Sequence, residues 1–273
     1  MHQSPSVAGC LTQRGLMQIA FTDQTVIVTG AAHGFGRAIA QAFAARGANV
    51  WACDLIAAEL VETAALCRAA GGGCTVRTVD VTQPAQVTAF VGEAIASAAS
   101  GHIDVLVNNA GGVLGQVGQP LEQVTYEQWN AIIAVNMSAA FYFAQAAAPG
   151  MKQARSGRII NISSGAGLGP SLTGIQAYAT AKAGQINLTR QLCHELGPYN
   201  ITVNNIAPGF VLSNANTQRQ WDAYGPEVQQ NLVQSIALQR LGQPNDIAHG
   251  VLFLASEYAG WISGQVISID GGK

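Results

Sequence analysis

TVIVTGAAHGFGRAIAQAF, residues 25–43, is the stretch from which the fold of this chain can be predicted. Its first four residues form a β-branched run that is typical of a buried strand. Glycines follow, and residues 37–43 then have helical periodicity. A strand, a glycine-rich turn and a helix place an anion against the helix N-terminus, where unpaired N–H groups and the positive dipole end receive it. The stretch predicts a phosphate-binding turn; a turn without a ligand is the alternative.

Three glycines of this turn, Gly30, Gly34 and Gly36, are assigned to the phosphate site. We expect glycine there because a Cβ would keep the backbone from approaching a pyrophosphate. His33 and Phe35 lie between these glycines and are assigned to the same site.

Asp54 follows a second predicted strand, residues 49–53. Its distance from the glycines matches the roughly 20-residue separation expected of an acid that binds an adenosine ribose. A carboxylate there accepts hydrogen bonds from the ribose hydroxyls and repels a 2′-phosphate, so we predict NAD rather than NADP. Leu55 follows Asp54 where a basic residue would favour NADP, and Arg37 is the nearby cation that weakens the preference. The alternative is that Asp54 only begins the next turn.

Strands and helices alternate along the rest of the chain. Further strands are expected at residues 74–79, 103–107, 158–162, 201–206 and 265–269. Helices are expected at residues 56–70 and 126–148, and another begins at residue 84. The helix that contains Tyr178 is expected to end at residue 196, and a final helix at residue 255. This alternation predicts an α/β fold with a doubly wound, mostly parallel sheet. We expect one domain, residues 22–273, after a disordered extension, residues 1–21, in which Met17 is an alternative start.

Composition narrows the classes of function. The 273 residues are 49% hydrophobic and 10% charged, with a net charge of −2 and no basic run, so nucleic acid and membrane are poor candidate partners. No apolar run approaches the length of a membrane span. Five cysteines without CxxC spacing argue against a disulfide framework and favour a cytoplasmic location. We predict no metal site.

Tyr178 and Lys182 lie four residues apart in a segment that is predicted to be helical. Side chains at this spacing share one helical face. A cation near a phenol favours the phenolate, which lowers the phenol pKa from about 10 and makes the group a usable proton donor and acceptor. On this pair alone, a core ring beside a solvated amine is the more common outcome.

Several segments together resemble the short-chain dehydrogenase/reductase family. The matching residues, in order, are Thr29-Gly30-xxx-Gly34-x-Gly36, Asp80-Val81, Asn108-Asn109-Ala110-Gly111, Asn136, Ser164, Tyr178-xxx-Lys182 and Pro208-Gly209. The resemblance implies a three-layer Rossmann fold with a seven-stranded sheet. It also implies a nicotinamide-dependent oxidoreductase that acts on an alcohol or a ketone.

The resemblance also implies roles for individual residues. Tyr178 would be the general acid/base, and Lys182 would lower its pKa and bind the nicotinamide ribose. Ser164 would hold the substrate oxygen, and Asn136 would hold a water of a proton relay. The implied cofactor contacts are Gly30, His33, Gly34, Phe35, Gly36, Asp54, Leu55, Asp80, Val81, Asn108, Ala110, Gly111, Tyr178, Lys182, Pro208, Gly209, Val211 and Ser213.

Some of these assignments have structural alternatives. Ser163 neighbours Ser164 and is expected to be a structural hydroxyl at the strand end. Asn108 could join neighbouring strand ends, and Asn136 could be a satisfied buried amide. Ser213 could be the N-cap of a following helix as well as a cofactor contact.

The sequence leaves the substrate open. Asn214, Asn216 and Gln218 suit a polyol or sugar, Trp221 and Tyr224 suit an apolar substrate, and the amides could equally face solvent. We expect oxidation of a secondary alcohol with NAD. The alternatives are an NADPH-dependent reductase of ketones carried by acyl-carrier protein and a non-enzymatic nucleotide sensor. Alanine-rich helices, together with the resemblance, predict a homotetramer.

Overall fold

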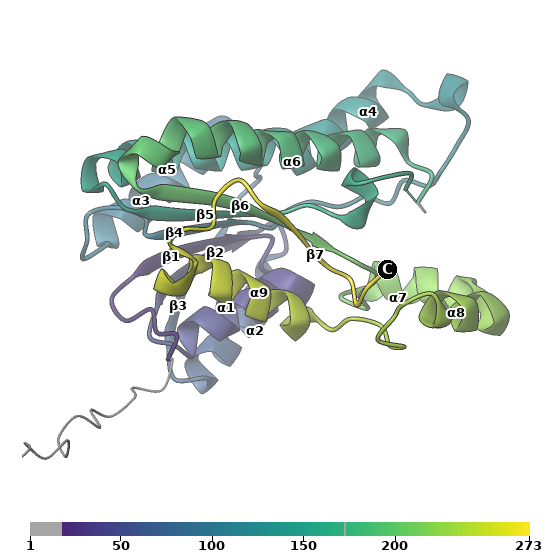
Figure 1. Ribbon diagram of the computed structural model, residues 1–273. Helices are drawn as coiled ribbons and strands as arrows, with labels where there is room; N and C mark the ends of the chain where they lie inside the picture. Colours follow the sequence, from purple (N-terminus) through teal and green to yellow (C-terminus); the bar gives the residue numbers. More distant parts are fainter. Residues whose placement is uncertain (1–17, 172) are drawn as a thin grey trace, which may run out of the picture.

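The computed structural model describes residues 18–171 and 173–273. Its centre is one seven-stranded sheet with the order β3-β2-β1-β4-β5-β6-β7 (Figure 1). The strands are β1 (Thr25–Thr29), β2 (Asn49–Asp54), β3 (Gly73–Thr78), β4 (Val105–Asn108), β5 (Gly157–Ile162), β6 (Ile201–Pro208) and β7 (Val266–Ile269). All six pairings between these strands are parallel, so the predicted mostly parallel sheet is parallel throughout.

Helices cover both faces of the sheet (Figure 1). One face carries α1 (Gly34–Ala44), α2 (Ala57–Ala69) and α9 (Pro244–Ala255), and the other carries α3 (Pro84–Ser97), α5 (Ala139–Ala154) and α6 (Gln176–Leu196). Beyond the carboxyl ends of the strands lie α4 (Tyr126–Ile133), α7 (Ala215–Ala223) and α8 (Gly225–Gln234). This is the predicted three-layer, doubly wound α/β fold.

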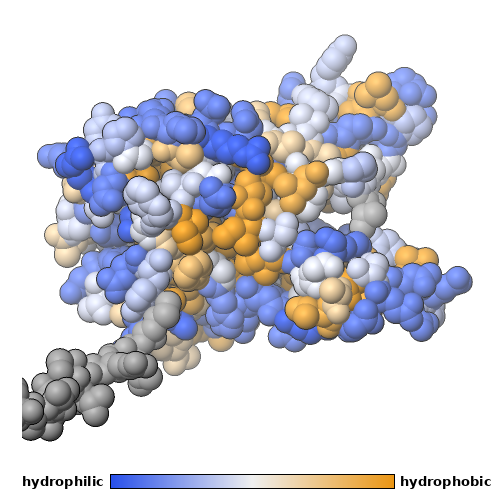
Figure 2. Space-filling view, viewed as in Figure 1, coloured by the Kyte–Doolittle hydropathy of each residue, from blue (hydrophilic) through white to orange (hydrophobic). Residues whose placement is uncertain are grey.

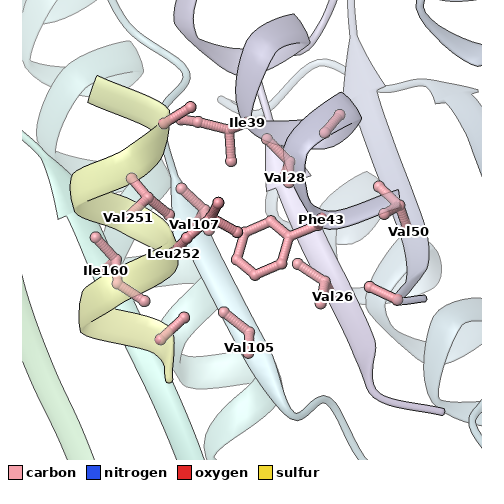
Figure 3. Close-up of a cluster of buried hydrophobic side chains, with 14 of the residues drawn as sticks. Val26, Val28, Ile39, Phe43, Val50, Val105, Val107, Ile160, Val251 and Leu252 are labelled. Carbon is pink, nitrogen blue, oxygen red and sulfur yellow. The ribbon is translucent and has the colours of Figure 1, made fainter. Parts of the chain in front are cut away.

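Apolar strands form the core because parallel strands are buried on both faces. Under α1 and α9, Phe43 is fully buried among valines of β1, β2 and β4 (Figure 3). Phe21 is also in this core, with its ring 4.7 Å from that of Phe43. Phe21 therefore belongs to the folded core, although it lies one residue before the predicted boundary at residue 22. Residues 1–17 of the predicted extension, including Met17, lie outside the described residues.

The strand order places a crevice at the carboxyl ends of β1 and β4. The chain winds from β1 to β2 on one side, and β4 pairs with β1 on the other side. Ligands of doubly wound sheets bind where the winding reverses in this way. Thr29 and Asn108, the last residues of these two strands, therefore mark the expected binding edge.

The helix predicted at residues 126–148 is interrupted. A π-helical turn, Ala134–Ser138, separates α4 from α5, and α5 continues to Ala154. Within residues 126–154, one 18-residue window has a mean hydropathy of 1.4, so this segment has the length and apolar composition of a membrane span, contrary to the expectation that no apolar run approaches that length. Core helices of soluble proteins have the same composition, and α5 packs Phe143 and Met151 against the sheet.

Candidate active site

The glycine turn is shaped by the chain's own packing. Gly30 and Gly34 have φ values of +66° and +58°. A Cβ on Gly30 would lie 2.7 Å from the Cα of Ala110, and one on Gly34 would lie 2.7 Å from the carbonyl oxygen of Ser213. A Cβ on Gly36 would lie 2.1 Å from the Gly30 oxygen. Helix, turn and neighbouring loops therefore leave no room for side chains at these glycines, and close approach of a pyrophosphate to them remains a prediction.

The N-terminus of α1 suits an anion. His33 is its N-cap residue but makes no capping hydrogen bond, and the first turn contains no acidic residue. By contrast, α4 and α7 carry complete capping boxes. The first N–H groups of α1 thus have no side-chain acceptor, which fits the pyrophosphate of a dinucleotide. Phe35 packs against the core rather than toward the turn's outer surface.

Asp54 is fixed beside this turn at the end of β2. Its Oδ2 accepts a hydrogen bond from the N–H of Ala32 at 3.0 Å. Its Oδ1 accepts from the N–H groups of Leu55 at 2.7 Å and Ile56 at 3.2 Å. The carboxylate is thereby held next to the glycine turn, where an adenosine ribose would need it, and Leu55 is 63% exposed at the same edge.

Two basic side chains near Asp54 are already paired. His33 Nδ1 lies 2.8 Å from Glu59 Oε2. Arg37 Nη2 lies 2.9 Å from Glu62 Oε2, and Arg37 Nε donates to the carbonyl oxygen of Ala32 at 2.9 Å. Both side chains are therefore engaged with acidic residues of α2.

The next predicted contacts, Asp80 and Val81, follow β3. Asp80 Oδ1 accepts hydrogen bonds from the backbone N–H and the hydroxyl of Thr82, at 2.9 and 2.7 Å. Val81 is 6% exposed and belongs to the core under α3. Their side chains thus shape the loop after β3, and a cofactor contact from this segment remains a prediction.

Asn108 and Asn109, at the end of β4, bind different neighbours. Asn108 is 3% exposed and donates to Asn161 Oδ1 at 2.9 Å, so its side chain joins β4 to β5, as the structural alternative predicted. Asn109 was not among the predicted site residues. Its amide donates to the carbonyl oxygens of Thr29 and Gly30, both at 2.9 Å, and so fixes the glycine turn. The second asparagine at the end of this strand was the sequence feature that could have indicated a structural role for Asn109.

Asn136 holds the loop after Ala110. Its Oδ1 accepts from the N–H of Gly112 at 2.9 Å, and its Nδ2 donates to the carbonyl oxygen of Gly112 at 2.8 Å and to that of Ile132 at 3.0 Å. The residue is fully buried within the π-helical turn. The satisfied-amide alternative therefore describes its side chain, and the relay water stays a prediction.

The two serines after β5 have different surroundings. The Ser163 hydroxyl is buried and donates to Asn205 Oδ1 and to the carbonyl oxygen of Ile206, which fits the predicted structural role. Ser164 is half-buried, accepts a hydrogen bond from the N–H of Ala166 at 3.1 Å, and lies close enough to the Tyr178 hydroxyl to lower the pKa of that phenol. Ser164 is thus the serine that faces the candidate tyrosine.

Tyr178 and Lys182 lie on one face of α6, as their spacing predicted. Lys182 Nζ lies 5.8 Å from the centroid of the Tyr178 ring and donates to the carbonyl oxygen of Ile162 at 3.0 Å. A Cβ on Gly111 would lie 3.2 Å from this nitrogen. The amine, the phenol and Ser164 therefore meet beside the loop that follows β4.

Burial controls the acidity of both groups. Desolvation lowers the pKa of Lys182 from 10.5 to about 7. Desolvation also raises the pKa of Tyr178, and the hydrogen bond with Ser164 opposes this. The expected lowering of the phenol pKa by Lys182 is therefore wrong: burial raises this pKa, and the Lys182 amine bonds to the carbonyl oxygen of Ile162 instead.

Residues after β6 complete the edge of the site. Pro208 ends the strand, and a Cβ on Gly209 would lie 2.7 Å from the Cα of Asp270, so the segment packs closely on the C-terminal loop. Val211 is buried and bridges to Gly242. The backbone of Ser213 contacts Gly34, which brings residues 211–213 beside the glycine turn.

The cap of α7 differs from the expectation. Asn214, not Ser213, is the N-cap residue, and its Oδ1 accepts from the N–H groups of Asn216 and Thr217. Thr217 completes the capping box, for which Ser213 is one residue too early.

The other amides of this segment are engaged within the helix. Asn216 Oδ1 accepts from Arg219, Gln218 donates to Asp222, and these contacts are exposed. Phe210, by contrast, packs its ring within 6.0 Å of the rings of Trp221 and Tyr224. The aromatic side chains, rather than the amides, form the interior of residues 210–224, which we call the lid.

Comparisons with known proteins agree with this architecture. A family model described as enoyl-(acyl carrier protein) reductase matches residues 30–273. The chain is 34% identical over 247 residues to the 7alpha-hydroxysteroid dehydrogenase of Escherichia coli (strain K12), covering 90% of this chain and 92% of the relative. It is 38% identical over 258 residues to the 3-oxoacyl-(acyl-carrier-protein) reductase FabG of Chlamydia trachomatis, covering 92% and 97%.

Solved structures are similar throughout their length. A 7 alpha-hydroxysteroid dehydrogenase complexed with NADH and 7-oxo glycochenodeoxycholic acid matches with a TM-score of 0.85 and 33% identity, over 93% of this chain and 95% of the other. Levodione reductase matches with a TM-score of 0.85 and 30% identity, over 92% and 97%. By sequence, fold and the order of its motifs, this chain belongs to the short-chain dehydrogenase/reductase family of oxidoreductases.

Proposed function

We propose that this protein interconverts a secondary alcohol and a ketone, with NAD as cofactor and Tyr178 as the general acid/base. The observation that carries the proposal is the meeting of Ser164, Tyr178 and Lys182 at the carboxyl edge of the sheet, beside the loop that contains Gly111. The nicotinamide ring would supply the carbon that gives or takes the hydride.

The side chains divide the remaining chemistry. The Ser164 hydroxyl holds the substrate oxygen against the phenol of Tyr178 and stabilises charge that develops on it. Tyr178 gives its proton to a ketone oxygen or takes one from an alcohol. Lys182, with a pKa near 7, carries a proton for part of the time at neutral pH, so it can return one to the phenol. Asn136 fixes residues 111–112 beside the amine.

Two features support NAD as the cofactor. The uncapped N-terminus of α1 fits a pyrophosphate, and the Asp54 carboxylate beside it fits two ribose hydroxyls. A 2′-phosphate would meet Asp54 as a like charge, while His33 and Arg37 are engaged with glutamates. Of the relatives, the hydroxysteroid dehydrogenase was solved with NADH.

The lid supports a largely apolar substrate rather than a sugar. Its amides cap or cross-link α7, whereas Phe210, Trp221 and Tyr224 pack together at its interior. Leu114 and Leu168, on loops after β4 and β5, are 56% and 52% exposed near the same edge. Two relatives are named for a hydroxysteroid and for levodione, which supports a carbocyclic alcohol or ketone.

A second candidate is the reduction of ketones on acyl-carrier protein. The observation that favours it is the 38% identity to FabG of Chlamydia trachomatis. This candidate predicts that a 3-oxoacyl thioester with NADPH turns over faster than any free alcohol with NAD.

A substrate screen tests the proposal. Carbocyclic alcohols, hydroxysteroids, polyols, sugars and hydroxy acids would be assayed with NAD and NADP by absorbance at the nicotinamide band, beside a 3-oxoacyl thioester with NADH and NADPH. We expect the highest kcat/KM for a carbocyclic alcohol with NAD. Preference for a sugar would contradict the apolar substrate, and preference for NADP would contradict the role of Asp54.

We also propose a homotetramer in the cytoplasm. A groove between α5 and α6 exposes apolar side chains that include Met137, Phe141 and Leu188, which suits helix packing between subunits. The four cysteines among the described residues are free thiols, which supports a reducing compartment.

A further inference from the structure

Charged side chains gather around residues 31–33 of the glycine turn. Asp54 approaches from β2 and binds the N–H of Ala32, while Arg37 approaches from α1 and binds its carbonyl oxygen. Glu59 and Glu62 approach from α2. The turn that would carry the adenosine end of the cofactor therefore lies among three carboxylates, one guanidinium and the imidazole of His33.

Glu59 has a special place in this cluster. Its Oε2 lies 2.8 Å from His33 Nδ1 and 3.8 Å from Arg37 Nη2. This one carboxylate therefore restrains the imidazole and also adds negative charge beside the guanidinium. The side chains of Glu59 and His33 are 41% and 40% exposed, so both are accessible to a ligand at the turn. Arg37 is only 19% exposed.

Arg37 is fastened independently of the Glu59 carboxylate. Its Nε donates to the Ala32 carbonyl oxygen and to the Thr63 hydroxyl, at 2.9 and 3.1 Å, and its Nη2 pairs with Glu62. Removing the Glu59 charge would leave these contacts in place. His33 is thus the side chain that Glu59 controls, and it lies in the turn itself, directly before Gly34.

We infer that Glu59 is a second determinant of cofactor selectivity, which deepens the proposed function and rests on it. By holding His33 and adding a negative charge beside Asp54, Glu59 excludes the 2′-phosphate of NADP. A phosphate monoester carries between one and two negative charges near neutral pH. To bind it, His33 would have to leave Glu59, and the carboxylate would then repel the phosphate.

Direct binding to the full-length protein tests the inference without an assay of turnover. Titration calorimetry would give the Kd of NAD⁺ and NADP⁺ for wild type, Glu59→Gln and the matched control Glu62→Gln, in low and high salt. Glutamine keeps the size of the side chain but removes the negative charge, which weakens its hold on His33. We expect Glu59→Gln to strengthen NADP⁺ binding relative to NAD⁺ by about fivefold to tenfold at low salt and less at high salt. Glu62→Gln should change the ratio by less than about twofold, since Glu62 contacts Arg37 and not His33.

The double variant His33→Gln/Glu59→Gln separates the restraint from the charge. If freed His33 binds the phosphate, the double variant should lose most of the gain seen in Glu59→Gln. An unchanged ratio in Glu59→Gln, an equal gain in Glu62→Gln, or a full gain in the double variant would each overturn the inference. Wild type that binds NADP⁺ more tightly than NAD⁺ would instead contradict the proposed cofactor itself.

Discussion

Lys182 shows how one buried side chain links stability to chemistry. Its amine is 3% exposed within α6, and burial lowers its pKa to about 7. In the unfolded chain the amine would titrate near 10.4. Between pH of about 7 and about 10.4, the amine is protonated in the unfolded chain but largely unprotonated in the folded protein. Because the unfolded chain binds more protons, this group makes the free energy of unfolding rise with pH. Its cost to stability is therefore greatest below pH of about 7 and fades as the pH approaches about 10.4.

Lys182→Met should remove this dependence. We expect the variant to be more stable than wild type at pH 6, by up to a few kcal/mol, with the difference shrinking toward pH 10. Urea unfolding at several pH values would measure it. Lys152→Met is the matched control, because Lys152 pairs with Glu195 near the surface and should show no such trend. A stability difference that does not vary with pH would contradict the depressed pKa.

Gly111 offers a second test at the residue scale. Its φ is +156°, and a Cβ would lie 2.5 Å from Asn136 Oδ1. Gly111→Ala should therefore displace the asparagine that holds Gly112, and we expect a loss of about 1–3 kcal/mol in unfolding free energy with weaker NAD binding. Thermal unfolding and calorimetry would measure both.

Gly92→Ala is the control for this substitution. Gly92 lies within α3, and a Cβ there would meet no atom within 4 Å. A helical alanine should be neutral or stabilising by up to about 1 kcal/mol. Similar losses in both variants would show that the contact with Asn136 is not what requires glycine at position 111.

At the scale of elements, the sequence predicted the order of strands and helices but not the features that tertiary contacts impose. The β-branched run of β1 and the Tyr178–Lys182 face of α6 follow from local periodicity. The π-helical turn does not, because it is stabilised by Asn136 reaching the backbone of Gly112, 24 residues earlier. Periodicity could not reveal it.

The same distinction holds within the site. Asn214 replaces Ser213 as the cap of α7 because Thr217 completes a capping box with it. Propensity and spacing do not define the end of a helix to within one residue, so they could not distinguish these two positions. The direction of the Tyr178 pKa shift depended on burial, which the sequence does not display. Pairing of His33 with Glu59, 26 residues apart, likewise depended on the fold.

Helix α6 contains a polar residue that the fold does not use. Gln185 is fully buried, and neither atom of its amide has a hydrogen-bond partner among residues 18–171 and 173–273. Replacing an unpaired buried amide by an apolar group of similar size removes a desolvation cost. We expect Gln185→Met to be neutral or stabilising by about 1 kcal/mol in urea unfolding.

Thr189→Val is the contrasting variant on the same helix. The Thr189 hydroxyl accepts from Asn161 Nδ2 at 2.9 Å and donates to the carbonyl oxygen of Gln185. Its loss should cost about 1–3 kcal/mol because it leaves Asn161 without this partner. A marked loss in Gln185→Met would mean that the glutamine amide is satisfied in solution.

At the scale of the whole molecule, two surfaces bear on assembly. The groove between α5 and α6 includes Phe141, which is 42% exposed. Figure 2 shows apolar residues gathered across another face, over α9 and the edge strand β7. Two distinct apolar faces on one chain suit an assembly with two kinds of interface, as a homotetramer has.

Light scattering would test the proposed assembly. We expect a mass of about four times the 28.3 kDa chain for wild type and a smaller species for Phe141→Glu, which buries a charge in the groove. Tyr126→Glu is the control, because Tyr126 is 86% exposed on α4 outside the groove. A monomeric wild type would contradict the tetramer.

The central claim, that Tyr178 transfers the proton while a bound dinucleotide transfers the hydride, is tested most directly by single-turnover kinetics of Tyr178→Phe with NADH prebound. The substitution removes the hydroxyl and keeps the ring. We predict that hydride transfer to the best ketone from the screen slows by at least about a thousandfold, while the Kd of NADH changes less than about threefold. Hydride transfer within about tenfold of wild type would contradict the claim, and a protein that binds NADH but reduces no ketone even as wild type would indicate a nucleotide sensor.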